Sequence, residues 1–111
     1  MRICIPVTPD GEVGSGFGRA AGVAIADVEA GTPGTWQEFD VHWDELHDTT
    51  TEGGHHARVA RFLLDQQVRI VLAGHMGPGM QQMLERMGID VRMGAAGDAR
   101  QAVTLATSAE G

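Results

Sequence analysis

The sequence contains a single cysteine, Cys4, among its 111 residues. One cysteine excludes an internal disulfide and any metal site built only of thiolates. Basic residues are also few, because 8 Lys and Arg residues stand against 15 Asp and Glu residues and give a formal net charge of −7. Such a surface repels phosphate backbones, so we expect no binding of nucleic acid.

Long hydrophobic runs and enzyme motifs are missing as well. No stretch approaches the roughly 18 apolar residues of a membrane-spanning helix, and the N-terminus enters a short strand-like run rather than a signal peptide. We therefore expect a cytoplasmic protein that does not bind membranes. The motifs G-x-S-x-G, G-K-[ST] and C-x-x-C are absent, and no pair of carboxylates suggests acid–base chemistry. These absences favour a binding protein over an enzyme.

The hydrophobic residues that are present, 42% of the chain, follow strand and helix periods in turn. This pattern predicts one domain over residues 1–108, of the α/β class, with a mixed sheet of about five strands and helices on its faces. We expect strands at 3–7, 22–28, 35–43, 68–73 and 89–93, helices at 57–67, 78–87 and 99–107, and a polar loop at 44–54. In such sheets ligands bind beyond the carboxyl ends of the parallel strands, where segments 14–19, 53–56 and 74–79 are expected to meet.

The histidines of these segments are candidate ligands. His55 and His56 lie at the expected start of a helix, whose dipole favours the neutral imidazole that binds metals. His75 lies on the turn into the next helix, and helix N-termini also present N–H groups to anions. We predict that these three side chains bind a metal or an anionic cluster together, the alternative being loop residues in water. His42 and His47 are interpreted as parts of a solvated acidic loop.

Four other residues of interest lie in or beside the glycine-rich turns and the first strand. Arg19 closes the first glycine loop and is either an anion ligand or an ordinary surface arginine. Phe17, between two glycines, is interpreted as an anchor for that loop, and Cys4 as a buried core residue. Met76 lies on the turn beside His75, from where it can reach a ligand.

Four short motifs occupy, in chain order, residues 3–7, 16–20, 71–78 and 87–91. Together they resemble the dinitrogenase iron–molybdenum cofactor biosynthesis and binding family, whose members are also called nitrogenase accessory factor-like domains. The resemblance implies a ribonuclease H-like motif: a three-layer α/β/α domain whose five-stranded sheet has one antiparallel strand. It also implies binding of the iron–molybdenum cofactor, its precursor or another metal–sulfur cluster. Where this family often has a histidine, the chain has Gly16.

The resemblance and the loop positions together predict the site. His55, His56 and His75 are the expected metal ligands, and the expected cofactor-binding residues are Gly16, Phe17, Gly18, Arg19, Gly74, Met76 and Gly77. The predicted function is that of a non-catalytic carrier or assembly protein that exchanges a cluster with donor or acceptor proteins, as a monomer or a homodimer. The alternatives are a module that binds a small anion or nucleotide without metal, and a degenerate domain that acts through protein contacts alone.

Overall fold

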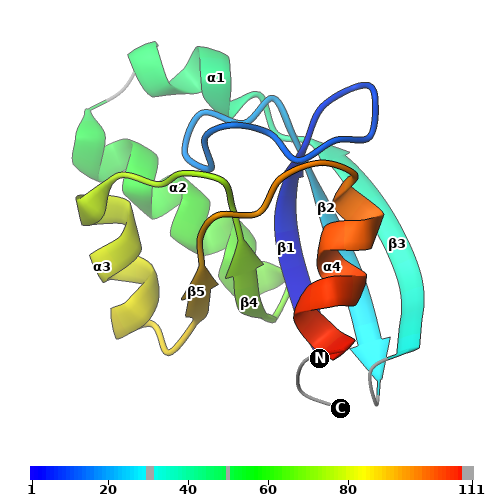
Figure 1. Ribbon diagram of the computed structural model, residues 1–111. Helices are drawn as coiled ribbons and strands as arrows, with labels where there is room; N and C mark the ends of the chain where they lie inside the picture. The colour runs from blue at the N-terminus through cyan, green and yellow to red at the C-terminus, as the bar shows by residue number, and fades with distance from the viewer. Residues whose placement is uncertain (30–31, 50, 109–111) are drawn as a thin grey trace.

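The computed structural model describes residues 1–29, 32–49 and 51–108, which form a mixed sheet with helices packed on both of its faces (Figure 1). In chain order the elements are β1 (Arg2–Val7), β2 (Gly22–Glu29), β3 (Thr32–Asp40), α1 (Trp43–Leu46), the short 3-10 helix η1 (His47–Thr49), α2 (Glu52–Asp65), β4 (Val68–Leu72), α3 (Pro78–Arg86), β5 (Asp90–Arg92) and α4 (Ala99–Ser108). None of these helices is both long and apolar enough to cross a membrane.

The five strands lie in the order β3-β2-β1-β4-β5. Strand β2 is antiparallel to both of its neighbours, whereas β4 and β5 run parallel to β1. The expected mixed sheet with one antiparallel strand, and with it the α/β class, is therefore confirmed. Because β1, β4 and β5 are parallel, the loops that follow them leave the sheet at the same edge.

The two sides of the sheet bury separate hydrophobic clusters. Helices α2 and α3 cover one face, where Cys4 and Val59 lie in the larger cluster, and α4 covers the other, where Ile3 and Ile5 meet Val103. This alternation along β1 is the period-2 pattern of a strand that is buried on both faces. The interpretation of Cys4 as a core residue is confirmed, and its burial raises the pKa of the thiol above the ordinary range.

The segment between β3 and α2 differs from expectation. Strand β3 ends at Asp40 and not at residue 43, and residues expected to form a polar loop include α1, η1 and the first turn of α2. His42, with a φ of 55°, turns the chain, and Trp43 then enters the core as the buried residue of α1. Helix α2 begins at Glu52 because the Thr51 side chain accepts a hydrogen bond from the Gly54 N–H at 3.1 Å, an N-cap that the polar composition concealed.

Candidate functional site

The loops that follow β1 and β4 meet the start of α2 around one cavity of about 330 Å³, at the carboxyl ends of the parallel strands. Its lining residues are Gly16, Phe17, Gly18, Arg19, His47, Glu52, His55, His56, His75, Met76, Gly77, Pro78, Gly79 and Met80. Nine of the ten sequence-predicted site residues belong to this lining, and Gly74 does not. A side chain at Gly74 would place its Cβ 3.2 Å from the Ala95 carbonyl oxygen and 3.4 Å from that of Ser15. Gly74 therefore lets three backbone segments approach one another closely.

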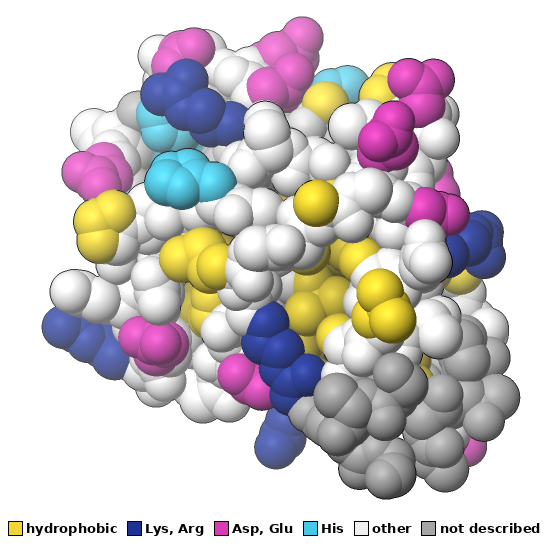
Figure 2. Space-filling model, viewed as in Figure 1, with side chains coloured by type: hydrophobic (Ala, Val, Ile, Leu, Met, Phe, Trp, Pro, Cys, Tyr) yellow, Lys and Arg dark blue, Asp and Glu magenta, His cyan; other side chains and the backbone are white. Residues whose placement is uncertain are grey.

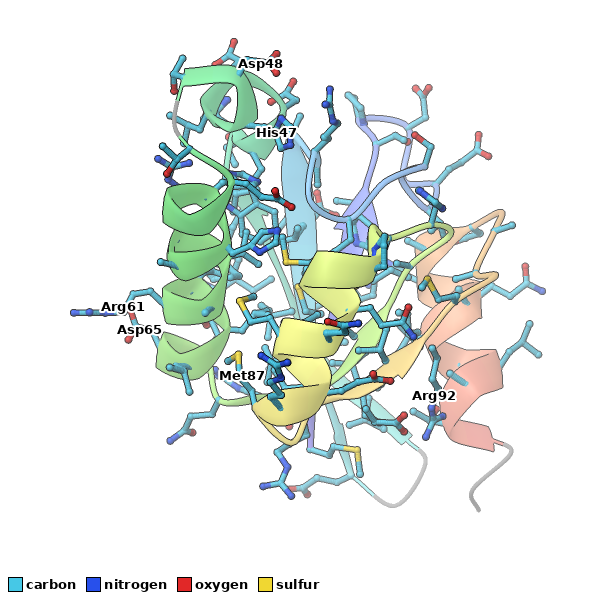
Figure 3. The ribbon with its side chains drawn as sticks, turned by 90° about the vertical axis from the view of Figure 1, so that its left-hand side faces the viewer. His47, Asp48, Arg61, Asp65, Met87 and Arg92 are labelled. Carbon is cyan, nitrogen blue, oxygen red and sulfur yellow. The ribbon has the colours of Figure 1, made fainter. Side chains whose placement is uncertain are left out.

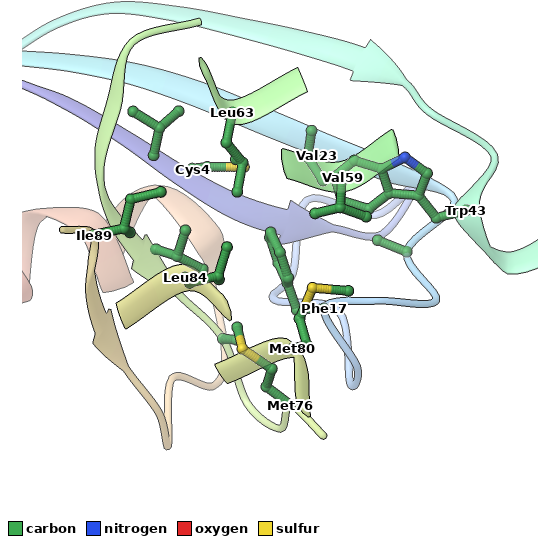
Figure 4. Packing of buried hydrophobic residues seen from close by; sticks show 14 of the residues in the cluster. Cys4, Phe17, Val23, Trp43, Val59, Leu63, Met76, Met80, Leu84 and Ile89 are labelled. Carbon is green, nitrogen blue, oxygen red and sulfur yellow. The ribbon is translucent and has the colours of Figure 1, made fainter. Parts of the chain in front are cut away.

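Phe17 anchors the first glycine loop. Its side chain is fully buried, and its ring meets the ring of Trp43 edge-on at a centroid distance of 5.4 Å (Figure 4). The Phe17 N–H also donates to the His75 carbonyl at 3.1 Å, and Gly16 pairs with His75 as an isolated parallel bridge. The interpretation of Phe17 as an anchor is thus confirmed. The same contacts join the loops of β1 and β4 into one wall.

His55 is a buried side chain with a partner for each ring nitrogen. It is only 1% exposed, its Nε2 lies 2.6 Å from the Gly18 carbonyl oxygen, and Arg58 Nη1 lies 3.0 Å from its Nδ1. A carbonyl only accepts and a guanidinium only donates, so Nε2 carries the proton and Nδ1 accepts from Arg58. The imidazole is neutral, as predicted, but neither nitrogen is free to bind a metal in this conformation. The predicted ligand role of His55 does not fit this geometry.

The pKa of His55 is lowered from its ordinary value of 6.5. Burial of the ring is the largest cause, and the charges of His47, Arg58 and His56 add to it, while the hydrogen bond to the Gly18 carbonyl acts in the opposite direction. Helix position was the cause expected from sequence, because a sequence pattern indicates where a helix starts but not how deeply one of its side chains is buried.

This depressed pKa makes the stability of the protein depend on pH. Below about pH 6.5 the unfolded chain protonates His55 while the folded protein holds it neutral, so the unfolded state binds more protons. We expect the free energy of unfolding to receive the full contribution of His55 above that pH and to fall as the pH decreases towards the folded pKa. Urea denaturation of the wild type and of His55→Gln at a series of pH values measures this. A difference between the two proteins that stays constant from pH 8 to 5 would contradict it.

The other histidines reach the cavity from separate elements. His56 is half-buried, with Nε2 3.8 Å from the Glu52 carboxylate, and His75 is exposed on the turn after β4. His47 lies in η1, near the start of α2 (Figure 3), and its ring meets the ring of His55 edge-on at 5.0 Å. Within residues 1–29, 32–49 and 51–108, no three His, Cys, Asp or Glu side chains gather closely enough to hold a metal ion. His55, His56 and His75 therefore do not form a preassembled metal centre.

His47 and Glu52 are cavity residues that sequence reasoning missed. Both lie in the segment that was interpreted as a solvated loop, and no local signal marks them. Their position depends on Trp43, which packs α1 against the core between the rings of Phe17 and Phe62, at 5.4 and 5.7 Å. A pattern within residues 42–52 contains no information about those two distant partners.

The remaining lining suits a negatively charged ligand with a soft surface. Arg19 is exposed at the rim, and Gly77 is the N-cap of α3, whose first-turn N–H groups have no acceptor within the helix. The buried side chains of Met76 and Met80 add thioethers to the cavity wall. Figure 2 shows histidine and basic side chains side by side at this end of the molecule, with acidic side chains around them.

Comparison with known proteins gives a family match over almost the whole chain. The family described as dinitrogenase iron-molybdenum cofactor matches residues 1–109. Among curated proteins, none is similar enough in sequence to match.

Three solved structures are similar in both fold and length. The crystal structure of PH0822 is 22% identical, with a TM-score of 0.80, over 98% of this chain and 90% of that chain. The apo form of the orange protein from Desulfovibrio gigas is 27% identical, with a TM-score of 0.72, over 98% of this chain and 88% of that chain. A putative NifB protein from Thermotoga is 23% identical, with a TM-score of 0.70, over 99% and 88%.

Proposed function

Since the chain belongs to the dinitrogenase iron–molybdenum cofactor family, we propose that it is a non-catalytic carrier or assembly protein for a metal–sulfur cluster, either the iron–molybdenum cofactor or a related cluster. The observation that carries the proposal is the cavity, where imidazoles, thioethers, Arg19 and the start of α3 converge from the loops after β1 and β4 and from the segment that begins α2. Support also comes from the similar fold of the orange protein, whose solved structure is described as the apo form.

The size and chemistry of the cavity fit such a cargo. A volume of about 330 Å³ is within the range of small-molecule sites, roughly 300–1,000 Å³. Metal–sulfur clusters are anionic, and backbone N–H groups at a helix start together with an arginine stabilise negative charge. Imidazole and thioether groups are suited to the softer metals.

The cavity contains no thiolate, which bears on how a cluster is held. Cys4 lies in the core, and burial keeps its thiol protonated, so it is not a ligand. We assign His56 and His75 as the ligands, one from α2 and one from the turn after β4, with Arg19 neutralising charge at the rim. A site with two imidazoles and no thiolate holds its cargo reversibly, which is what delivery to an acceptor protein requires.

The test is cluster uptake by the apo protein without oxygen. We expect the wild type to bind isolated iron–molybdenum cofactor and tetrathiomolybdate, measured by molybdenum content and visible absorption after gel filtration. The variant His56→Ala/His75→Ala should bind at least about tenfold more weakly, because loss of the hydrogen-bond partner of a metal ligand already costs roughly 10–100-fold in affinity. The control is His42→Asn, because His42 is exposed outside the cavity lining and asparagine tolerates its left-handed backbone.

Two outcomes would contradict the assignment: no uptake by the wild type, or equal uptake by the double variant. The first, combined with binding of inorganic phosphate or a nucleotide in titration calorimetry, would favour the alternative of an anion-binding module without metal. That alternative has a physical basis, because Arg19 and the first-turn N–H groups of α3 interact with any negatively charged group. Absence of any ligand would leave the third alternative, a domain that acts through protein contacts.

A further inference from the structure

We propose that His55 is a positioning residue, which fixes the turn at Gly18 and Arg19 and thereby sets how tightly the cavity holds its cargo. The effect on cargo rests on the proposed function, but the fixed turn is a property of the apo protein. His55, in α2, would then act on the ligand through the backbone of the loop at Gly18, 37 residues away in the sequence, rather than by coordination.

The segment whose conformation His55 holds is a four-residue turn, residues 17–20. The Ala20 N–H donates to the Phe17 carbonyl at 3.3 Å, so the peptide bond between Gly18 and Arg19 is the central peptide of the turn. Type I and type II turns differ by a flip of this central peptide, and type II needs a positive φ at the third residue. Arg19 has no positive φ, so the central peptide of the turn has the type I orientation.

His55 contacts the group whose direction distinguishes the two orientations. Its Nε2–H donates to the carbonyl of Gly18, and in a trans peptide the carbonyl and the following N–H point in opposite directions. Fixing the Gly18 carbonyl on α2 therefore also fixes the direction of the Arg19 N–H. Gly18 and Arg19 both line the cavity, so the orientation of this peptide determines which backbone groups the cargo meets.

Within the turn, Arg19 opposes a flip of this peptide, because a residue other than glycine disfavours the positive φ that a type II turn requires. Gly18 contributes little to holding the turn, because it has no side chain and glycine populates more of the backbone map than any other residue. The residue before it is different, because the Phe17 ring is fully buried and anchors the loop. The hydrogen bond from His55 therefore acts on the turn residue that has no side chain of its own to hold it.

His55 is itself held firmly enough to serve as this support. Its Nδ1 accepts from Arg58, one turn further along α2, and its ring meets the ring of His47 edge-on at 5.0 Å. The His55 side chain is 1% exposed, so the protein around it and not solvent sets the position of its ring. A rigid helix, a buried ring and two hydrogen bonds together define one position for the peptide.

The experiment compares three variants, His55→Leu, His55→Gln and Leu63→Ala, by tetrathiomolybdate titration and by ¹⁵N NMR of the apo protein. We expect His55→Leu to bind tetrathiomolybdate about tenfold more weakly, the loss expected when one hydrogen bond from the backbone to the charged cargo is missing. The amide signals of residues 18–19 should shift, and their hydrogen exchange should become faster. His55→Gln should recover most of the affinity, since its side-chain amide can still donate to the Gly18 carbonyl. Leu63→Ala is the matched control, because Leu63 is a fully buried α2 residue outside the cavity lining and its loss lowers stability alone.

The inference is overturned if His55→Leu binds like the wild type, or if Leu63→Ala, at a similar melting temperature, loses affinity equally. If His55→Leu does not fold, the imidazole ¹⁵N shifts of His55 in the wild type give the test. They must show a proton on Nε2, and a proton on Nδ1 would refute the hydrogen bond to the Gly18 carbonyl. These apo measurements need no cargo. A wild type that binds no cluster but shows the fixed turn would therefore refute the proposed function and leave the fixed turn standing.

Discussion

Replacing Phe17 with alanine is expected to lower the free energy of unfolding by about 3–5 kcal/mol, the usual loss for a buried aromatic side chain. Phe17 is completely buried, its ring packs edge-on against Trp43, and it is the contact through which the cavity loop enters the core (Figure 4). Urea denaturation followed by circular dichroism measures the change. The loop at 16–19 should also lose its defined position, because its only other side chain, that of Arg19, is exposed.

Phe39→Ala is the control for this prediction. Phe39 lies on the edge strand β3, is only partly buried, and packs edge-on against Phe62 at 5.4 Å, far along the chain from the glycine loop. Its loss removes an aromatic pair of the same geometry but less buried area, so the destabilisation should be smaller. Equal losses for the two variants would show that Phe17 has no special role in attaching the loop.

Replacing Trp43 with alanine has the second large expected effect, a loss of about 3–5 kcal/mol in the free energy of unfolding. Trp43 is the buried residue of α1, a helix too short to be stable without tertiary contacts. Its removal should release α1 and η1 from the core and withdraw His47 from the cavity. Limited proteolysis should then cut within 42–49, and the NMR contact between the rings of His47 and His55 should disappear.

A Trp43→Phe variant tests whether any aromatic ring at this position holds α1 on the core or whether the larger indole is needed. A phenyl ring preserves an edge-on contact with Phe17, so most of the protection from proteolysis should return, although the smaller ring leaves a cavity. Persistence of the His47–His55 contact in Trp43→Ala would mean that the segment is held by something other than this side chain. The combined Phe17→Ala/Trp43→Ala variant should lose less than the sum of its parts, because each single change already removes their shared contact.

Strand boundaries were predictable wherever neighbouring residues alone defined them. Strands expected at 3–7, 22–28 and 68–73 are found at Arg2–Val7, Gly22–Glu29 and Val68–Leu72, since each is a short apolar run that ends in turn residues. The boundary at 43 was wrong because Trp43 continues the alternation of Phe39 and Val41. All three do face the same hydrophobic cluster, as the alternation predicted, but Trp43 reaches it from a helix.

Gathering of the candidate residues at one end of the sheet also followed from sequence. Parallel strands joined by helices place their following loops on the same edge, and this rule requires only the order of elements. The role of each residue did not follow. Gly74 and His55 were both expected at a ligand, yet one allows the backbone to pack closely and the other supports a neighbouring loop.

The sequence by itself therefore determined the class of fold, the family, and the edge of the sheet where a ligand can bind, because periodicity, short motifs and strand order are properties of the chain. Only the tertiary structure decided the chemistry at that edge. Whether an imidazole is a ligand or a support depends on burial and on partners such as Gly18 and Arg58, and the position of His47 depends on the packing of Trp43. Burial and distance are set by residues far apart in the chain, and no local pattern records them.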